Sequence, residues 1–217
     1  MDNQAGARQP YRIVTPPSAA TMACKRAFDI LCSFLGLAVL SPVLLVVSVL
    51  VAVTSPGGVF FRQERIGKDG KLFRIFKFRS MRKDNAGLKI TTGNDSRITP
   101  VGRFLRKSKI DELPQLINVL VGDMSFVGPR PEVADYVNLY TPYQRQVLLV
   151  RPGITGLASI RFRNENDLLT ASDDPNRTYV EQIMPRKIDL DLEYIPHASV
   201  FYDIKLIFQT FAVVIKE

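Results

Sequence analysis

The sequence predicts an α+β protein that is mostly helical, with one small β-hairpin, and that associates with a membrane through an N-terminal re-entrant helix-break-helix hairpin. Three observations indicate this fold class. An apolar stretch runs from Phe28 to Val53 and is interrupted only by Asp29 and small polar residues. Two strand-like segments flank a Gly-Lys-Asp-Gly turn at residues 67–70, and apolar residues at helical spacing recur in later segments.

Residues 1–22 are predicted to be a flexible arm. Pro10, Pro16 and Pro17 stand there among small and polar residues, and the segment has no apolar periodicity. A segment of this composition buries too little apolar surface to offset the entropy lost on folding. It is not a signal peptide, so the first apolar stretch of the chain lies further on.

Residues 23–54 are predicted to be the membrane element. The apolar stretch is long enough to cross a bilayer as a straight helix, which takes ~20 residues. Ser41 and Pro42 lie near its middle. Proline removes a backbone hydrogen bond and kinks a helix, while a serine hydroxyl can bond to the freed backbone groups. A kinked span and a hairpin that turns back at this pair are both compatible with the pattern.

Positive residues flank the apolar stretch on both sides: Lys25 and Arg26 precede it, and Arg62, Arg65 and Lys68 follow it. A simple span concentrates its positive residues on the cytoplasmic side. We therefore expect both ends to lie on the cytoplasmic face and the segment to form a re-entrant hairpin. The alternative is that the downstream charges serve the folded domain and carry no information about topology.

Residues 55–217 are predicted to form one cytoplasmic domain. It begins with a β-hairpin, because residues 59–66 and 71–81 are strand-like and enclose the turn. A polar loop and three helical regions follow, at residues 83–99, 100–121, 179–194 and 201–215. The last helix is amphipathic, and we expect it to pack on the core, with a place at the membrane surface as the alternative.

The composition favours an anionic partner. The formal net charge is +8 and the isoelectric point is near 9.6, which suits nucleic acid, an acidic membrane face or a phosphorylated substrate. No signature of a nucleic-acid-binding module is present. Cys24 and Cys32 provide neither a disulfide framework nor a metal cluster, in keeping with a reducing cytoplasm. The single histidine, His197, is expected to be structural, so any catalysis must use carboxylates.

Asp111 and Glu112 are candidate functional carboxylates. Pro114 lies in the first turn of the helical pattern that follows them, which places the pair at a helix N-terminus. The free N–H groups and the positive end of the dipole there favour a bound anion and keep a carboxylate ionised, which suits a nucleophile or a metal ligand. The alternative for an aspartate in this position is a simple N-cap.

Arg130 lies between Pro129 and Pro131. The prolines keep this segment out of the helical region, so the guanidinium projects from a stiff, extended backbone, an arrangement that suits phosphate oxygens. Lys77 and Arg79, which end a predicted strand, are further phosphate-binding candidates, as is Arg106, which lies in a group of cations just before the carboxylates. For any one of these cations the alternative is a solvated surface charge.

Five segments together resemble one known family. They are FFRQERIG at 60–67, FKFRSM at 76–81, GRFLRKSKIDELPQL at 102–116, GDMSFVGPRPE at 122–132 and RPGITGLA at 151–158. Their order and content resemble the bacterial sugar transferases and, more narrowly, the monotopic phosphoglycosyl transferases that start glycan assembly on a polyprenol carrier. The resemblance covers roughly residues 22–217 and also implies the re-entrant hairpin.

The resemblance implies a two-step transfer of a sugar 1-phosphate from a UDP-sugar to polyprenol phosphate at the cytoplasmic face of the bacterial inner membrane. Asp111 would attack the β-phosphate and carry the sugar phosphate covalently. Glu112, with Asp111 close by, would hold Mg2+, while Lys77, Arg106 and Arg130 would clamp phosphate oxygens. Arg161 and Arg163 stand where many relatives have a shorter Asn-Gly-Arg arrangement, so both are candidates for contact with the nucleotide.

Two other functions are compatible with the sequence. A membrane-tethered nucleic-acid-binding protein would explain the basic charge but would tolerate the loss of Asp111. A non-catalytic scaffold for glycan assembly would keep the hairpin and the surface but release no nucleotide. We expect membrane lipids, a UDP-sugar and polyprenol phosphate as partners, and no nucleic acid. The sequence specifies neither the sugar nor the oligomeric state.

Overall fold

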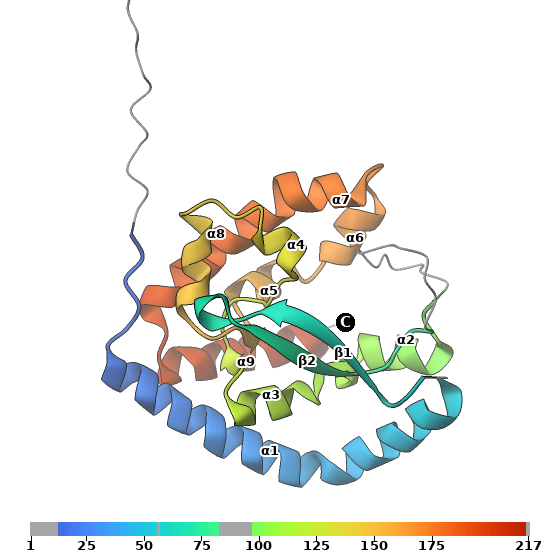
Figure 1. Ribbon diagram of the computed structural model, residues 1–217. Coiled ribbons are helices and arrows are strands. Elements are labelled where there is room, and N and C mark those ends of the chain that lie inside the picture. The colour runs from blue at the N-terminus through green and yellow to red at the C-terminus, as the bar shows by residue number, and fades with distance from the viewer. Residues whose placement is uncertain (1–12, 56, 83–96, 216–217) are drawn as a thin grey trace, which may run out of the picture.

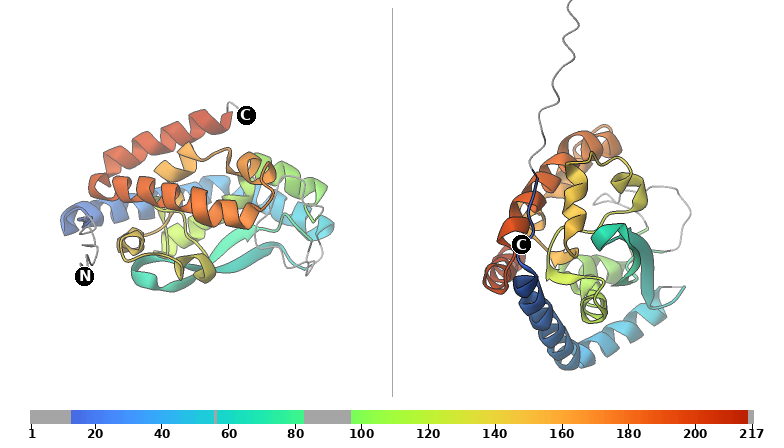
Figure 2. Two further views of the ribbon diagram at one scale, coloured as in Figure 1. Left: turned by 90° about the horizontal axis from the view of Figure 1, so that it is seen from above. Right: turned by 60° about the vertical axis from the view of Figure 1, so that its left-hand side comes forward.

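The computed structural model describes residues 13–55, 57–82 and 97–215. Most of the predicted polar loop at 83–99 and the first twelve residues of the predicted arm therefore lie outside the described residues. The fold is mostly helical with a small antiparallel hairpin, which confirms that part of the predicted fold class (Figure 1). In projection the hairpin crosses the middle of the molecule (Figure 1), but it lies at one face, with most of the helices behind it (Figure 2).

The elements before the carboxylate pair and just after it are α1 (Ala19–Thr54), β1 (Phe60–Ile66), η1 (Lys68–Gly70), β2 (Leu72–Phe78), α2 (Pro100–Lys107), η2 (Ile110–Glu112), α3 (Gln115–Val121) and β3 (Ser125–Val127). The remaining elements are α4 (Ala134–Val137), η3 (Gln144–Leu149), β4 (Gly153–Thr155), α5 (Leu157–Arg161), α6 (Glu165–Thr170), α7 (Pro175–Thr178), η4 (Tyr179–Ile183), α8 (Met184–Tyr194), η5 (Ile195–His197) and α9 (Val200–Ile215). Of these, η4 is a π-helical turn and the other η elements are 3-10 turns. The hairpin and the helices expected at 179–194 and 201–215 are therefore confirmed.

Helix α1 is continuous over 36 residues and contains Pro42. The predicted break at Ser41 and Pro42 is therefore absent, but the helix is bent between its two ends (Figures 1 and 2). The Ser41 hydroxyl donates to the carbonyl oxygen of Ala38 at 2.7 Å, so it bonds to the backbone just before the proline. In length and mean hydropathy, α1 is the one helix among the described residues that qualifies to cross a membrane.

The first arm of α1 is fixed to the rest of the fold by buried polar contacts. The Lys25 ammonium donates to Ser125 Oγ at 2.6 Å and to the Val127 carbonyl at 3.1 Å, and it forms an ion pair with Asp203 of α9. Tyr194 donates to the second carboxylate oxygen of Asp203 at 2.6 Å. We call these residues the Lys25 cluster. Its lysine is a buried structural residue, so the expectation that it marks membrane topology as a flanking surface charge is wrong.

The second arm of α1 is fixed by apolar packing. Val47 and Val51 are buried against Phe78 of β2 and Leu105 of α2. Between the two anchored regions, large apolar side chains are exposed, namely Ile30, Leu31, Phe34, Leu35, Val39, Val43, Leu45 and Val46. Both arms of α1 therefore contact one and the same folded domain, while the bend between them presents an apolar surface.

The hairpin pairs β1 with β2 in the register Phe61 to Lys77 and Arg65 to Phe73. Side chains alternate between the faces of a strand, so Phe61, Arg65 and Lys77 share one face. Helix α3 covers the outer edge of β2 through Asn118, whose side chain accepts from the Phe76 N–H at 2.9 Å and donates to the Arg74 carbonyl at 2.9 Å. These two hydrogen bonds pair backbone groups at the strand edge that would otherwise lack a hydrogen-bond partner.

A second pair of strands, β3 and β4, is parallel and was not expected from the sequence. The segments approach so closely that a Cβ on Gly153 would lie 2.1 Å from the Gly128 amide nitrogen, and a Cβ on Gly156 would lie 2.4 Å from the Gly128 carbonyl oxygen. Glycine is needed at these positions because the two backbones are in direct contact. This contact fixes the segment that carries Arg130.

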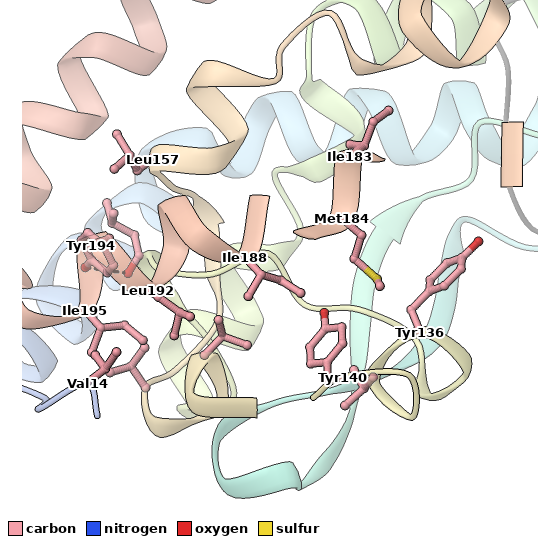
Figure 3. Packing of buried hydrophobic residues seen from close by; sticks show 14 of the residues in the cluster. Val14, Tyr136, Tyr140, Leu157, Ile183, Met184, Ile188, Leu192, Tyr194 and Ile195 are labelled. Atoms are coloured by element: carbon pink, nitrogen blue, oxygen red, sulfur yellow. Dashed lines mark hydrogen bonds between the residues drawn. The ribbon is translucent and has the colours of Figure 1, made fainter. Parts of the chain in front are cut away.

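The largest hydrophobic core lies between α8 and the segments of α4, η3 and β3, with Ile188 and Leu192 at its centre (Figure 3). Val14 is buried in this core, and its N–H donates to Gln146 at 2.7 Å. Helix α1 begins at Ala19. Residues 13–22 are thus part of the fold, so the predicted arm extends too far along the chain.

Helix α9 packs on the domain through Asp203, Leu206 and Thr210, and Thr210 shares a 2.8 Å hydrogen bond with Thr155 of β4. Phe201, Phe208 and Phe211 are exposed instead. The expectation that this helix packs on the core is therefore confirmed, with Asp203 and Leu206 on its packed face and the three phenylalanines on its exposed face.

Candidate functional site

The two candidate carboxylates lie in the 3-10 turn η2, directly before α3. Lys109 precedes this turn with a φ of 58°, in the left-handed region that lysine rarely adopts. Such a conformation costs ~1 kcal/mol or more and persists only where the surroundings fix it. The strained residue reverses the chain after α2 and turns Asp111 inward, where it is only 7% exposed. The predicted position next to a helix N-terminus is confirmed, with Leu113 and Pro114 between the pair and α3.

Glu112 is held by two cations. Lys77 Nζ donates to Glu112 Oε1 at 2.7 Å, and Arg130 Nη2 donates to the same oxygen at 3.2 Å. Burial opposes ionisation of this carboxylate, but the charges of Lys77 and Arg130 outweigh burial and hold its pKa well below the usual range. Glu112 in turn raises the pKa of Arg130. Glu112 is therefore a permanently ionised anchor for two predicted phosphate-binding cations.

Asp111 has the opposite electrostatic environment. Burial raises its pKa, and the adjacent Glu112 charge adds to that effect, while Lys77, Arg106 and Lys109 act against it. Its Oδ1 atom is buried and has no hydrogen-bond partner among the described residues. That Asp111 is ionised stays a prediction, and burial, the largest influence on its pKa, acts against the expected effect of the helix start. The open oxygen is available to a ligand.

Arg130 lies on a rigid segment, as the flanking prolines predicted. Pro129 accepts from the Gly153 N–H at 2.9 Å, and Pro131 accepts from Arg65 Nη1 at 3.1 Å. Behind the segment lies Asp191 of α8, whose pKa is raised to about 7 by burial, although Lys187 and the backbone N–H groups of Ala158 and Arg130 lower it. The backbone on both sides of Arg130 is therefore held by hydrogen bonds, and the Arg130 guanidinium is held by its ion pair with Glu112.

The structure brings together only some of the predicted cations. Lys77 and Arg130 meet at Glu112, and Arg106 lies near enough to Asp111 to lower its pKa, with its Nη1 3.5 Å from the Met81 sulfur. Arg79 instead donates to the Phe60 carbonyl at 3.4 Å and lies against the loop that follows α1.

Arg161 and Arg163 are exposed at the end of α5 and beyond it, and the described contacts include no hydrogen bond or ion pair for either. The structure thus does not connect these two arginines to the carboxylate pair. The described contacts therefore do not show which of the two arginines would bind the nucleotide.

The fit of a divalent cation depends on Asp111 and Glu112. Among the described residues no group of three or more acidic, histidine or cysteine side chains is placed to form a protein cage for a metal. Mg2+ does not need such a cage, because it is usually held by one or two carboxylates together with substrate phosphates and water. The unpartnered Oδ1 of Asp111 and the adjacent Glu112 carboxylate supply that donor set. The pair is compatible with Mg2+ bound together with a phosphorylated substrate.

Sequence reasoning missed two residues of this site. Arg65 shares the hairpin face of Lys77, and a pocket beside the carboxylate pair is lined by both, together with Gln115 and Arg130. The strand register was the signal for Arg65, since residues an even number of positions apart in paired strands share a face. Gln115 gave no such signal, because its place in the pocket depends on how α3 docks against the hairpin.

Comparison with known proteins agrees with this architecture. Residues 20–217 match the bacterial sugar transferase family. The chain is 43% identical over 202 residues to the UDP-glucose:undecaprenyl-phosphate glucose-1-phosphate transferase of Escherichia coli K12, which covers 90% of this chain and 41% of that protein. It is 38% identical over 199 residues to the UDP-N-acetylgalactosamine-undecaprenyl-phosphate N-acetylgalactosaminephosphotransferase of Aeromonas hydrophila, covering 89% of this chain and 44% of that protein.

The match covers almost the whole length of a third relative. The exopolysaccharide production protein PSS of Rhizobium leguminosarum bv. phaseoli is 41% identical over 196 residues, covering 86% of this chain and 92% of that protein. The chain thus spans less than half of the first two relatives and almost all of the third. Because the family match extends over nearly the whole chain, the protein belongs to the bacterial sugar transferase family.

Proposed function

We propose that the protein is a phosphoglycosyl transferase that moves a sugar 1-phosphate from a UDP-sugar to polyprenol phosphate. The observation that carries this proposal is the unequal pair of carboxylates: Glu112 is neutralised by Lys77 and Arg130, whereas buried Asp111 keeps one oxygen open. A pair that served only to cap α3 would have its oxygens satisfied by the helix N–H groups. The two relatives that are named for their reaction act on a UDP-sugar and undecaprenyl phosphate, which supports the same substrate classes here.

In the first step, an Asp111 oxygen attacks the β-phosphorus of the UDP-sugar. A bond forms between this oxygen and phosphorus, the bond between the β-phosphorus and the bridging oxygen breaks, and UMP leaves with that oxygen. In the second step, an oxygen of polyprenol phosphate attacks the same phosphorus and releases Asp111. The products are UMP and a polyprenyl diphosphate sugar. Burial raises the pKa of Asp111, while Lys77, Arg106 and Lys109 lower it and so favour the ionised carboxylate that attacks.

The cations stabilise charge on the phosphoryl group. Arg130 is fixed on its rigid segment and can offer its remaining N–H groups to non-bridging oxygens, while Lys77 lies on the other side of Glu112. Arg106 adds positive charge near Asp111. Mg2+, when bound to the carboxylate pair, would neutralise the diphosphate of the donor.

We further propose that α1 enters the cytoplasmic leaflet of the bacterial inner membrane and returns to the same face. The buried contacts of the two arms of α1 support this proposal. Lys25 of the first arm and Val51 of the second arm are both buried against the same domain, so a helix that crossed the bilayer would have to break one of these contacts. The exposed apolar bend between them would lie among lipid chains. This position brings the site within reach of a lipid phosphate.

A panel of nucleotide sugars tests the chemistry. Purified protein would be incubated with each UDP-sugar, Mg2+ and polyprenol phosphate, and release of UMP would be measured. We expect UMP with at least one sugar and none from a matched Asp111→Asn protein. A protein that binds DNA or RNA with steep salt dependence and releases no UMP with any donor would instead be the nucleic-acid-binding alternative.

Labelling of single cysteines tests the topology. In a variant without Cys24 and Cys32, Ala20→Cys and Lys71→Cys place thiols at exposed positions before and after the apolar bend. Both should react with a membrane-impermeant maleimide only in inside-out vesicles. Reaction of one of them from the periplasmic side of intact spheroplasts would show a membrane-spanning helix and contradict the re-entrant arrangement.

A further inference from the structure

A small pocket lies beside the carboxylate pair, between the hairpin, α3 and the segment of Arg130. Its lining residues include Arg65, Ile75, Lys77, Gln115, Arg130 and Pro131. Three of them are cations, and Lys77 and Arg130 both contact Glu112. The pocket is therefore next to the reacting centre, on the side of the two cations.

Gln115 is the unexpected member of this lining. It is the first residue of α3 and is only 2% exposed, and its amide has no hydrogen-bond partner among the described residues. Asn118, one turn later on the same helix, is equally buried but uses both ends of its amide on the edge of β2. The amide atoms of Gln115 are not among the fully buried side-chain atoms that lack a partner, so part of the amide surface remains accessible. Gln115 therefore keeps hydrogen-bonding groups that no described residue uses.

Arg65 supplies a second open group in the same pocket. Its Nη1 donates to Pro131 at 3.1 Å and its Nη2 to Gln63 at 2.7 Å, and it pairs with Glu132 at 3.6 Å. Its Nε atom is buried and has no acceptor among the described residues. Two neighbouring elements, β1 and α3, thus each present an unused hydrogen-bonding group to one pocket.

We propose that Gln115 and Arg65 form a subsite for a non-bridging oxygen of the phosphoryl group that is transferred, with Gln115 as a substrate-binding residue. The inference rests on the proposed function. The Arg65 Nε–H can only donate, the Gln115 amide can donate, and Lys77 and Arg130 make the pocket positive, so the matching ligand is an anionic oxygen. Lys77 and Arg130 line the pocket and both contact Glu112, the neighbour of Asp111, so we infer that this oxygen belongs to the phosphorus that Asp111 attacks.

The transferred phosphoryl group is the only phosphate present in both steps of the reaction. The subsite therefore acts in both, since it holds the same oxygen while UMP leaves and while the lipid phosphate attacks. A contact to the second phosphate of the donor would matter only in the first step. A contact to the phosphate of the acceptor would matter only in the second.

The matched test is Gln115→Met, which keeps the length of the side chain and removes its hydrogen-bonding groups. Because the amide has no partner in the unliganded protein, we expect the melting temperature to stay the same or rise. The Kd for UDP, measured by calorimetry, should rise by about ten-fold or more, the loss expected for one hydrogen bond to a charged oxygen. Gln182→Met, at an exposed position, is the control and should change neither quantity.

The two steps are then measured separately in the Gln115→Met protein. Slower UMP release before lipid is added, together with slower discharge by polyprenol phosphate, supports the subsite. Slowing of one step alone would assign the contact to the other donor phosphate or to the acceptor and overturn the proposal. A lower melting temperature with unchanged affinity for UDP would also overturn it, because Gln115 would then be structural. Wild-type protein that releases no UMP would refute the proposed function itself, and the UDP titration would still test the pocket.

Discussion

The Lys25 cluster and the carboxylate pair are both buried groups of opposite charges, but they differ in how completely their hydrogen bonds are satisfied. Lys25 has three acceptors, and both oxygens of Asp203 are bonded. In the pair, Asp111 keeps an open oxygen. A closed cluster stabilises a fold, whereas a cluster with unused groups fits a ligand that completes it. The difference separates a structural site from a chemical one within a single chain.

The largest expected effect comes from opening the closed cluster. Asp203→Asn leaves the Lys25 charge buried without its counter-ion, which should lower the free energy of unfolding by ~3–5 kcal/mol. Chemical denaturation in detergent measures this loss. Glu181→Gln, which breaks the exposed pair with Arg177 one helical turn away, is the control and should cost less than ~0.5 kcal/mol. Equal losses in the two variants would show that burial of the Lys25 cluster is not what stabilises the fold.

The next effect concerns Asp191, whose raised pKa of about 7 makes the stability of the fold dependent on pH. Between the ordinary aspartate pKa and 7 the folded protein binds the proton more tightly than the unfolded chain, so the contribution of this group to stability is largest at low pH and is lost as the pH rises through 7. The full difference is at most ~4 kcal/mol.

Thermal unfolding from pH 5 to pH 8 measures this dependence. Asp191→Asn should be less sensitive to pH than the wild type across that range, and the exposed neighbour variant Asp189→Asn should follow the wild type. If Asp191→Asn has the same pH dependence as the wild type, the carboxyl group of Asp191 is not the one that titrates.

A smaller effect is expected from Arg130→Lys. The charge next to Glu112 remains, but an ammonium group cannot make the two-pronged contact of a guanidinium with phosphate oxygens. The rate of UMP release should fall by roughly 30-fold, equivalent to ~2 kcal/mol, with little change in melting temperature. Arg186→Lys, at an exposed arginine of α8, is the matched control. A wild-type rate in Arg130→Lys would return Arg130 to the role of an ion-pair partner of Glu112.

Local sequence patterns predicted several of the helices and the hairpin, whereas the contacts of individual side chains depend on packing between segments far apart in the sequence. The hairpin and the last two long helices follow from periodicity and turn chemistry. The strands β3 and β4 have three residues each, too few for a periodic signal. Lys25 looked like a topological charge because its partner Asp203 lies 178 residues further along the chain.

The sequence pointed to several residues of the candidate site but did not predict the direction of the Asp111 pKa shift. Three of the predicted site residues, Glu112, Lys77 and Arg130, are in contact in the structure, and the helix start and the prolines that pointed to Glu112 and Arg130 can be read locally. The raised pKa of Asp111 depends on burial, which the sequence around it does not encode. Gln115 entered the site only through the docking of α3 against the hairpin.

The most direct test of the account is the reaction of the protein with a UDP-sugar and Mg2+ in the absence of lipid. If Asp111 is the nucleophile, the protein should release at most about one equivalent of UMP per site and gain the mass of one sugar phosphate. Polyprenol phosphate should then remove this sugar phosphate from the protein. Asp111→Asn should show neither, whereas Glu112→Gln should form the adduct slowly. UMP that appears only when both substrates are present, or a normal adduct on the Asp111→Asn protein, would contradict attack by Asp111.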